Sequence, residues 1–92
     1  MTDKAKHTSH PAVIKRLRRA DGHLRKIIAM IEEERPCLDI AQQLQAVESA
    51  VNAAKKTLIH DHLDHCLDEA LDPASGTGRS VVGAFKQITR YL

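Results

Sequence analysis

The 92-residue sequence is poor in aromatic residues, glycine and proline. Its only aromatics are Phe85 and Tyr91, which excludes a base-stacking surface for single-stranded nucleic acid. Four Gly and three Pro are too few for a turn-rich β-barrel or sandwich. No apolar run approaches the roughly 20 residues of a membrane span, and the first ten residues lack the apolar core of a signal peptide. We therefore expect a soluble, cytoplasmic protein without membrane contact.

Charge, cysteine and histidine are unevenly distributed along the chain. The net charge is only +2, yet 10–26 contains six bases and one acid, whereas 61–72 contains five acids and no Lys or Arg. The chain has two Cys and six His, and in a cytoplasm two thiols more often bind a metal or react than form a structural disulfide. The length allows a single domain over 1–92, with 1–10 as a flexible tail.

The spacing of apolar residues predicts three helices and no strand. In the first stripe the apolar residues are 4, 3, 4, 3 and 4 apart, and the second stripe repeats this pattern after Pro36. The stripes are Val13, Leu17, Ala20, Leu24, Ile27 and Ile31, then Ile40, Leu44, Val47, Val51, Ala54 and Leu58. They predict helices over about 11–34, capped by Ser9 or His10, and about 37–70. A loop at 71–78 then precedes a short helix over about 79–91.

Two long amphipathic helices cannot bury both stripes within one chain. A helical hairpin leaves one apolar face uncovered, and pairing two hairpins as an antiparallel four-helix bundle covers it. The fold prediction is therefore all-α, with a three-helix protomer in an obligate dimer or in an oligomer built from dimers. A three-helix monomer is the alternative.

The cysteines and histidines suggest a metal site shared between two chains. His62 and Cys66 are four residues apart, so they lie on one face of the second helix. Cys37 precedes His62 by 25 residues, which is about 37 Å along a straight helix. Cys37 can join His62 and Cys66 only from a second chain whose helix runs antiparallel, and symmetry then gives two sites per dimer.

Two thiolates and one imidazole form a soft ligand set. A trigonal site of this kind suits Cu(I), whereas an added nitrogen ligand would suit Ni(II), Co(II) or Zn(II). Further histidines that could supply it are His60 and His65 on the second helix and His7 and His10 near the N-terminus. The alternative interpretation is two buried structural cysteines beside a polar histidine face.

Three segments resemble the copper-sensitive operon repressor family (CsoR/RcnR). They are 16–27 (RLRRADGHLRKI), 37–52 (CLDIAQQL followed by AVESAVN) and 61–66 (DHLDHC). The resemblance covers about 11–70 and includes the Cys, His, Cys spacing of 25 and then 4 residues. It implies an all-helical dimer of dimers that represses transcription when metal-free and leaves its operator DNA when the effector binds.

The resemblance identifies Cys37, His62 and Cys66 with the family's metal ligands, but other positions depart from the copper-sensing pattern. Pro36 and Val82 occupy positions where copper sensors often have Tyr and Glu, which leaves the effector open. The nickel- and cobalt-sensing branch has His at the position of Cys66 and another His near position 5, which is Ala5 here. Formaldehyde- and persulfide-sensing relatives are further alternatives, although His62 disfavours the persulfide branch.

The charge pattern and the resemblance both predict binding to double-stranded operator DNA. The bases expected to contact phosphates are Lys15, Arg16, Arg18, Arg19, Arg25, Lys26, Lys55 and Lys56. Affinity should therefore fall steeply with salt. A metal-buffering protein without DNA binding is an alternative, but it would not need six bases along one helix. An enzyme is not expected, because Cys66 beside His62 or His65 is the only nucleophile–base candidate.

Overall fold

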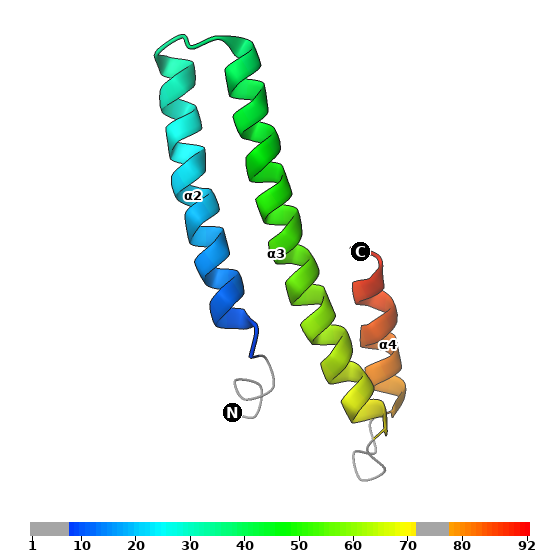
Figure 1. Ribbon diagram of the computed structural model, residues 1–92. Coiled ribbons are helices and arrows are strands. Elements are labelled where there is room, and N and C mark those ends of the chain that lie inside the picture. Colours follow the sequence, from blue (N-terminus) through cyan, green and yellow to red (C-terminus); the bar gives the residue numbers. More distant parts are fainter. Residues whose placement is uncertain (1–7, 72–77) are drawn as a thin grey trace. The chain divides into compact units, whose positions relative to one another are not determined.

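The computed structural model describes residues 8–71 and 78–92, which form three α-helices and no strand. Helix α2 spans His10–Glu32, α3 spans Cys37–Leu71 and α4 spans Gly78–Thr89 (Figure 1). The three predicted helices are confirmed with ends within two residues of those expected, and so is the all-α class of the protomer. No helix in the described ranges is long and apolar enough to cross a membrane. Most of the predicted tail, including His7, lies outside the described residues.

The turn between α2 and α3 is a Schellman motif. The N–H of Glu34 donates to the carbonyl of Ile31 (3.0 Å), and the N–H of Arg35 donates to the carbonyl of Met30 (3.0 Å). These two bonds satisfy carbonyls that the end of α2 would otherwise leave without partners. They require a left-handed backbone conformation at the residue that donates the first of them. Glu34 is that residue, with a φ of 57°. Pro36 follows the motif, where a helix cannot continue.

The chain divides into two compact units. The hairpin unit is Pro11–Lys55, and the C-terminal unit comprises the described residues of Lys56–Leu92 together with residues 8–10. In the hairpin unit, α2 and the first part of α3 lie antiparallel (Figure 1), and Ala20, Ile27 and Val47 form a buried cluster against which Ile40 packs. Because α3 runs through both units, this division does not test the expectation of one domain, which stays a prediction.

In the C-terminal unit, α4 lies beside the last turns of α3 (Figure 1). Ile59 and Cys66 of α3 are 2% and 5% exposed, and Phe85 and Ile88 of α4 are half-buried. The Ser9 hydroxyl, considered above as a helix cap, donates a hydrogen bond to Asp61 Oδ2 (2.8 Å). This contact joins two residues that are 52 positions apart.

One chain buries only every second residue of each apolar stripe. On α2, Val13, Ala20 and Ile27 are buried, whereas Leu17, Leu24 and Ile31 are 40–54% exposed. On α3, Val47 and Ala54 are buried, whereas Leu44, Val51 and Leu58 are 38–45% exposed. Fully burying one such large apolar side chain stabilises a protein by about 1.5–3 kcal/mol. The uncovered half of the stripes therefore favours association, and the predicted four-helix-bundle dimer and dimer of dimers stay predictions.

Candidate metal centre and nucleic-acid interface

Cys37 is the first residue of α3, and its side chain is exposed. The helix begins here because the carbonyl of Pro36 already accepts the N–H of Ile40 (3.2 Å), while the proline ring separates α3 from the preceding turn. The thiol is therefore presented at a helix end that the Schellman turn holds in place. An exposed thiol on an ordered backbone is accessible to a metal ion or to a second chain.

His62 and Cys66 lie one turn apart near the other end of α3. Cys66 is buried and His62 is half-buried, so the thiol is held among the side chains of the C-terminal unit. His62 also lines an open pocket of about 470 Å³ between α3 and α4, together with Gln87 and Tyr91. The separation of four residues keeps His62 and Cys66 on one face, as the sequence predicts.

The described part of one chain does not assemble a complete metal site. No group of three or more His, Cys, Asp or Glu side chains within that part lies close enough to hold a metal ion. Cys37 and Cys66 are not joined in a disulfide. Of the further histidines, His10 and His65 are half-buried and His60 is exposed. His62 and Cys66 thus share one face of α3, and Cys37 lies at the other end of that helix, so the metal ligands expected from the sequence stay a prediction.

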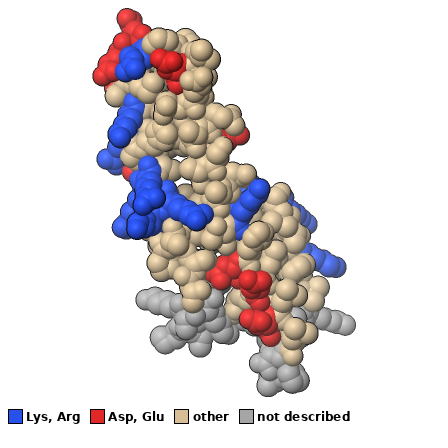
Figure 2. Space-filling model, in the orientation of Figure 1, with Lys and Arg blue, Asp and Glu red and all other residues tan. Residues whose placement is uncertain are grey.

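The bases predicted to bind DNA from α2 are all exposed. Figure 2 shows basic side chains along one edge of the hairpin unit, and acidic side chains with a basic one among them at the end of the unit that carries the turn. The exposed bases of α2 are Lys15, Arg16, Arg18, Arg19, Arg25 and Lys26. Arg25 forms an exposed ion pair with Asp21 (3.3 Å) one turn away, and such surface pairs contribute little to stability. Lys55 and Lys56 on α3 are exposed as well.

A basic pocket of about 290 Å³ lies where α2 meets α3. Arg16, Arg19 and His23 line it from α2, over a floor that includes Ala20, and Ala50 and Ala53 line it from α3. Its lining thus combines three small alanines with two arginines and one histidine. An open pocket with two guanidinium groups at its rim suits an anion such as a phosphate, which arginine can bind through paired N–H groups.

His23 is the pocket residue that the sequence analysis did not identify. Its Nε2–H donates to Gln43 Oε1 across the two helices (2.6 Å), which fixes the imidazole at the edge of the pocket. The sequence does contain a signal, because His23 follows Arg16 by seven residues and Arg19 by four. That spacing places all three on one face of α2.

The hairpin unit separates its apolar and basic surfaces. On α2, the exposed Leu17 and Leu24 each follow a pocket residue, Arg16 or His23, by one position. Adjacent residues of an α-helix point about 100° apart. The uncovered apolar stripe and the basic pocket therefore face different directions.

A family model described as "metal-sensitive transcriptional repressor" matches residues 9–90. The chain belongs to this family. The match confirms the resemblance found at 16–27, 37–52 and 61–66. The relatives are named as transcriptional repressors rather than enzymes, in agreement with the expectation that this chain is not an enzyme.

Relatives in the family include copper sensors. The copper-sensing transcriptional repressor CsoR of Bacillus subtilis (strain 168) is 34% identical over 82 residues, which cover 85% of this chain and 79% of the relative. CsoR of Mycobacterium ulcerans (strain Agy99) is 35% identical over 82 residues, 89% of this chain and 64% of the relative. The copper-sensing repressor RicR of Mycobacterium tuberculosis (strain ATCC 25618 / H37Rv) is 44% identical over 57 residues, 62% of this chain and 59% of the relative. The chain thus spans about three fifths of the length of these mycobacterial relatives.

A solved structure in the comparison is that of a nickel regulator. The nickel-responsive transcriptional regulator InrS superposes on this chain with a TM-score of 0.79 and 29% sequence identity, covering 94% of this chain and 96% of InrS. The likeness supports the all-helical fold of the protomer. Some of these proteins are named for copper and one is named for nickel. The choice of metal for this chain therefore rests on the chemistry of its own residues.

Proposed function

We propose that this protein is a metal-responsive repressor that binds operator DNA when metal-free and releases it when Cu(I) binds. In this proposal Cys37 of one chain joins His62 and Cys66 of the partner subunit. The observation that carries it is the exposed apolar stripe on α3, because an antiparallel pairing that covers this stripe can also bring the three ligands together.

The stripe of Leu44, Val51 and Leu58 is symmetric about Val51, with seven residues on either side. If two α3 helices pack antiparallel about Val51, Leu44 of one chain faces Leu58 of the partner subunit, and all three residues are covered. Cys37 lies 14 residues before Val51 and therefore faces position 65 of the partner, between His62 and Cys66. The apolar pattern thus allows the register that the ligand spacing requires.

The residues suit a soft metal. Two thiolates and one imidazole match Cu(I), and the copper-sensing relatives agree with this choice. Ni(II) is the second candidate because of the likeness to InrS. Nickel, cobalt or zinc would require a further ligand, for which His65 on α3, His10 at the start of α2 and His7 are available. When bound, the metal links one end of α3 to the opposite end of α3 in the partner.

The basic surface of the hairpin unit supports DNA binding. Arg16, Arg19 and His23 would hold one backbone phosphate in their pocket, and the other exposed bases of α2 would bind neighbouring phosphates. Lys56, which belongs to the C-terminal unit, is a further exposed base that can bind phosphate. Since the pocket and the metal site use different side chains, metal need not compete with DNA for the same groups. Release would follow from a change in the relative position of basic pockets on paired chains.

Anaerobic titration of the reduced, full-length protein with Cu(I), Ni(II), Co(II) and Zn(II) tests this proposal. Metal binding is followed by absorbance, and release of a duplex from upstream of the protein's own gene is followed by gel shift. We expect the metal-free protein to bind the duplex and Cu(I) to release it.

A Cys37→Ala variant should bind the duplex as tightly as the native protein but should not release it, because Cys37 is exposed and lies outside the basic pocket. Gln42→Ala, which removes another exposed side chain from α3, is the matched control and should respond normally. Absence of DNA binding by the metal-free protein, or full release of the Cys37→Ala variant by Cu(I), would contradict the proposal.

A further inference from the structure

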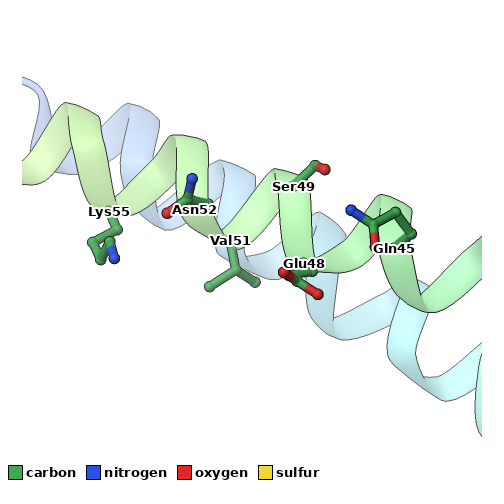
Figure 3. Close-up of a pocket in the computed structure, with 6 residues that line it drawn as sticks. All are labelled: Gln45, Glu48, Ser49, Val51, Asn52 and Lys55. Carbon is green, nitrogen blue, oxygen red and sulfur yellow. The ribbon is translucent and has the colours of Figure 1, made fainter. Parts of the chain in front are cut away.

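The middle of α3 carries a pocket whose lining residues all come from that one helix. It is open, has a volume of about 570 Å³ and is lined by Gln45, Glu48, Ser49, Val51, Asn52 and Lys55. Figure 3 shows that Glu48, Val51 and Lys55 project from the same side of the helix. Val51 is the centre of the exposed apolar stripe. This surface therefore combines an apolar residue with one acid and one base, without a second helix among its lining residues.

The two charges match the spacing of the two cysteines. Glu48 lies 11 residues after Cys37, and Lys55 lies 11 residues before Cys66. In an antiparallel pair of identical helices, a register that sets Cys37 against Cys66 of the partner subunit therefore also sets Glu48 against Lys55 of the partner. Its two-fold axis passes between Val51 and Asn52, half a residue from the pairing about Val51 described above. The two-fold symmetry produces this pair twice, once on each side of the axis.

We propose that Glu48 and Lys55 form two symmetric intersubunit ion pairs, which select the antiparallel register that brings Cys37 to the partner's metal ligands. The inference rests on the proposed intersubunit metal site and adds the residues that align it. The occupant of the α3 surface is a second copy of this chain, because only a second copy supplies the complementary charges in the same register as the thiols.

The same pair of residues disfavours the neighbouring registers. A slip of seven residues in one direction sets Glu48 against Glu48 of the partner subunit, and a slip in the other direction sets Lys55 against Lys55 of the partner. The apolar stripe alone tolerates such slips, because its residues also repeat every seven positions. Like charges in register destabilise the wrong pairing. The apolar residues thus favour association, and the charges determine the alignment.

This assignment gives Lys55 a partner other than the DNA phosphate expected from the sequence. Lys56 is the next residue and points about 100° away around the helix, so it stays available to phosphate. The role of Lys55 is that of a positioning residue, since it acts on metal binding through the alignment of Cys37 with its partner ligands.

Charge reversal at each position, separately and together, tests the inference. In a homodimer of E48K, the introduced lysine would face Lys55 of the partner subunit. In a homodimer of K55E, the introduced glutamate would face Glu48 of the partner subunit. We expect each single variant to lose about tenfold or more in Cu(I) affinity, since close interfacial charge pairs have coupling energies of about 1.5 kcal/mol or more. The double variant E48K/K55E restores opposite charges and should recover native affinity within about threefold.

Mixing the two single variants provides the sharper test. In a mixed dimer both pairs are complementary, so E48K and K55E should preferentially form a heterodimer that binds Cu(I) as the native protein does. This outcome holds even if each variant alone is poorly associated or unfolded. Chelator competition measures the Cu(I) affinity, and native mass spectrometry measures the composition of the dimer. E33K makes the same charge change at an exposed position in the turn and should leave both properties unchanged.

The possible outcomes separate this inference from the proposed function. If the native protein binds no metal and no DNA, the proposed function fails. If the native protein binds both, but neither the double variant nor the mixture recovers affinity, then Glu48 and Lys55 do not pair and the inference is wrong. Unaltered affinity in both single variants would overturn it as well.

Discussion

At the scale of single residues, Glu34 occupies a backbone conformation that suits glycine. Among the described residues it is the only non-glycine with a positive φ, 57°. The Schellman turn requires this conformation, which costs a residue with a Cβ about 1–2 kcal/mol. The turn must nevertheless form, since it places Cys37 at the start of α3.

We expect Glu34→Gly to stabilise the protein by about 0.5–1 kcal/mol, because relief of the left-handed strain exceeds the entropy that glycine adds to the unfolded chain. Urea unfolding at a fixed protein concentration measures the change. Glu33→Gly is the control, since Glu33 precedes the left-handed position, and it should be neutral or destabilising. A loss of stability in Glu34→Gly would show that the Glu34 side chain contributes more than its backbone strain costs.

The candidate site residues differ in how far the sequence could predict them. Cys37, His62 and Cys66 stand out because their residue types are rare in this chain and their spacing has a chemical meaning. His23 was missed, because its place in the basic pocket depends on Gln43, which is 20 positions away on another helix. Its spacing from the two pocket arginines places it on their face of α2, but the hydrogen bond to Gln43 follows from packing between helices and could not be predicted from that spacing.

At the scale of helices, the apolar stripes predicted the elements but not which of their residues are covered. The end of α2 falls at Glu32, two residues before the predicted end, because the Schellman bonds donated by Glu34 and Arg35 close the helix there. Alternate residues of the stripes are buried or exposed according to which side of each helix meets its neighbour. The spacing alone could not make that distinction, since both sets repeat every seven residues.

The basic side of α2 provides a prediction at this scale. Arg16→Ala or Arg19→Ala should weaken DNA binding, and the slope of log affinity against log salt should become shallower by about one or more, because each arginine neutralises a phosphate. Cu(I) affinity should stay within about threefold of native, a change below about 1 kcal/mol. Gel shifts over a salt series measure the slope.

Arg35→Ala is the control for this series. Arg35 is an exposed arginine in the turn, within 4.0 Å of Glu33, and it lies outside the basic pocket. Its loss should leave the salt dependence close to that of the native protein. If the slope is unchanged in both pocket variants, the phosphate contacts lie on another surface.

At the scale of the whole molecule, a single chain neither covers its apolar stripes nor brings the three proposed metal ligands together. Half of each apolar stripe stays exposed, and Cys37 is separated from His62 by 25 residues of helix α3. One antiparallel pairing about Val51 would cover the α3 stripe and complete both metal sites. Because family membership does not itself establish the pairing of chains, the intersubunit site is the central claim to test.

The most direct test mixes two inactive variants, Cys37→Ala and the double variant His62→Ala/Cys66→Ala. In a mixed dimer, one site would retain all three ligands and the other would lose all three. We therefore expect verified heterodimers to bind about one Cu(I) tightly, although neither parent does, and this affinity should decrease as the pH falls because both thiols must be deprotonated. If verified heterodimers bind Cu(I) no more tightly than their parents, the metal site does not span two chains.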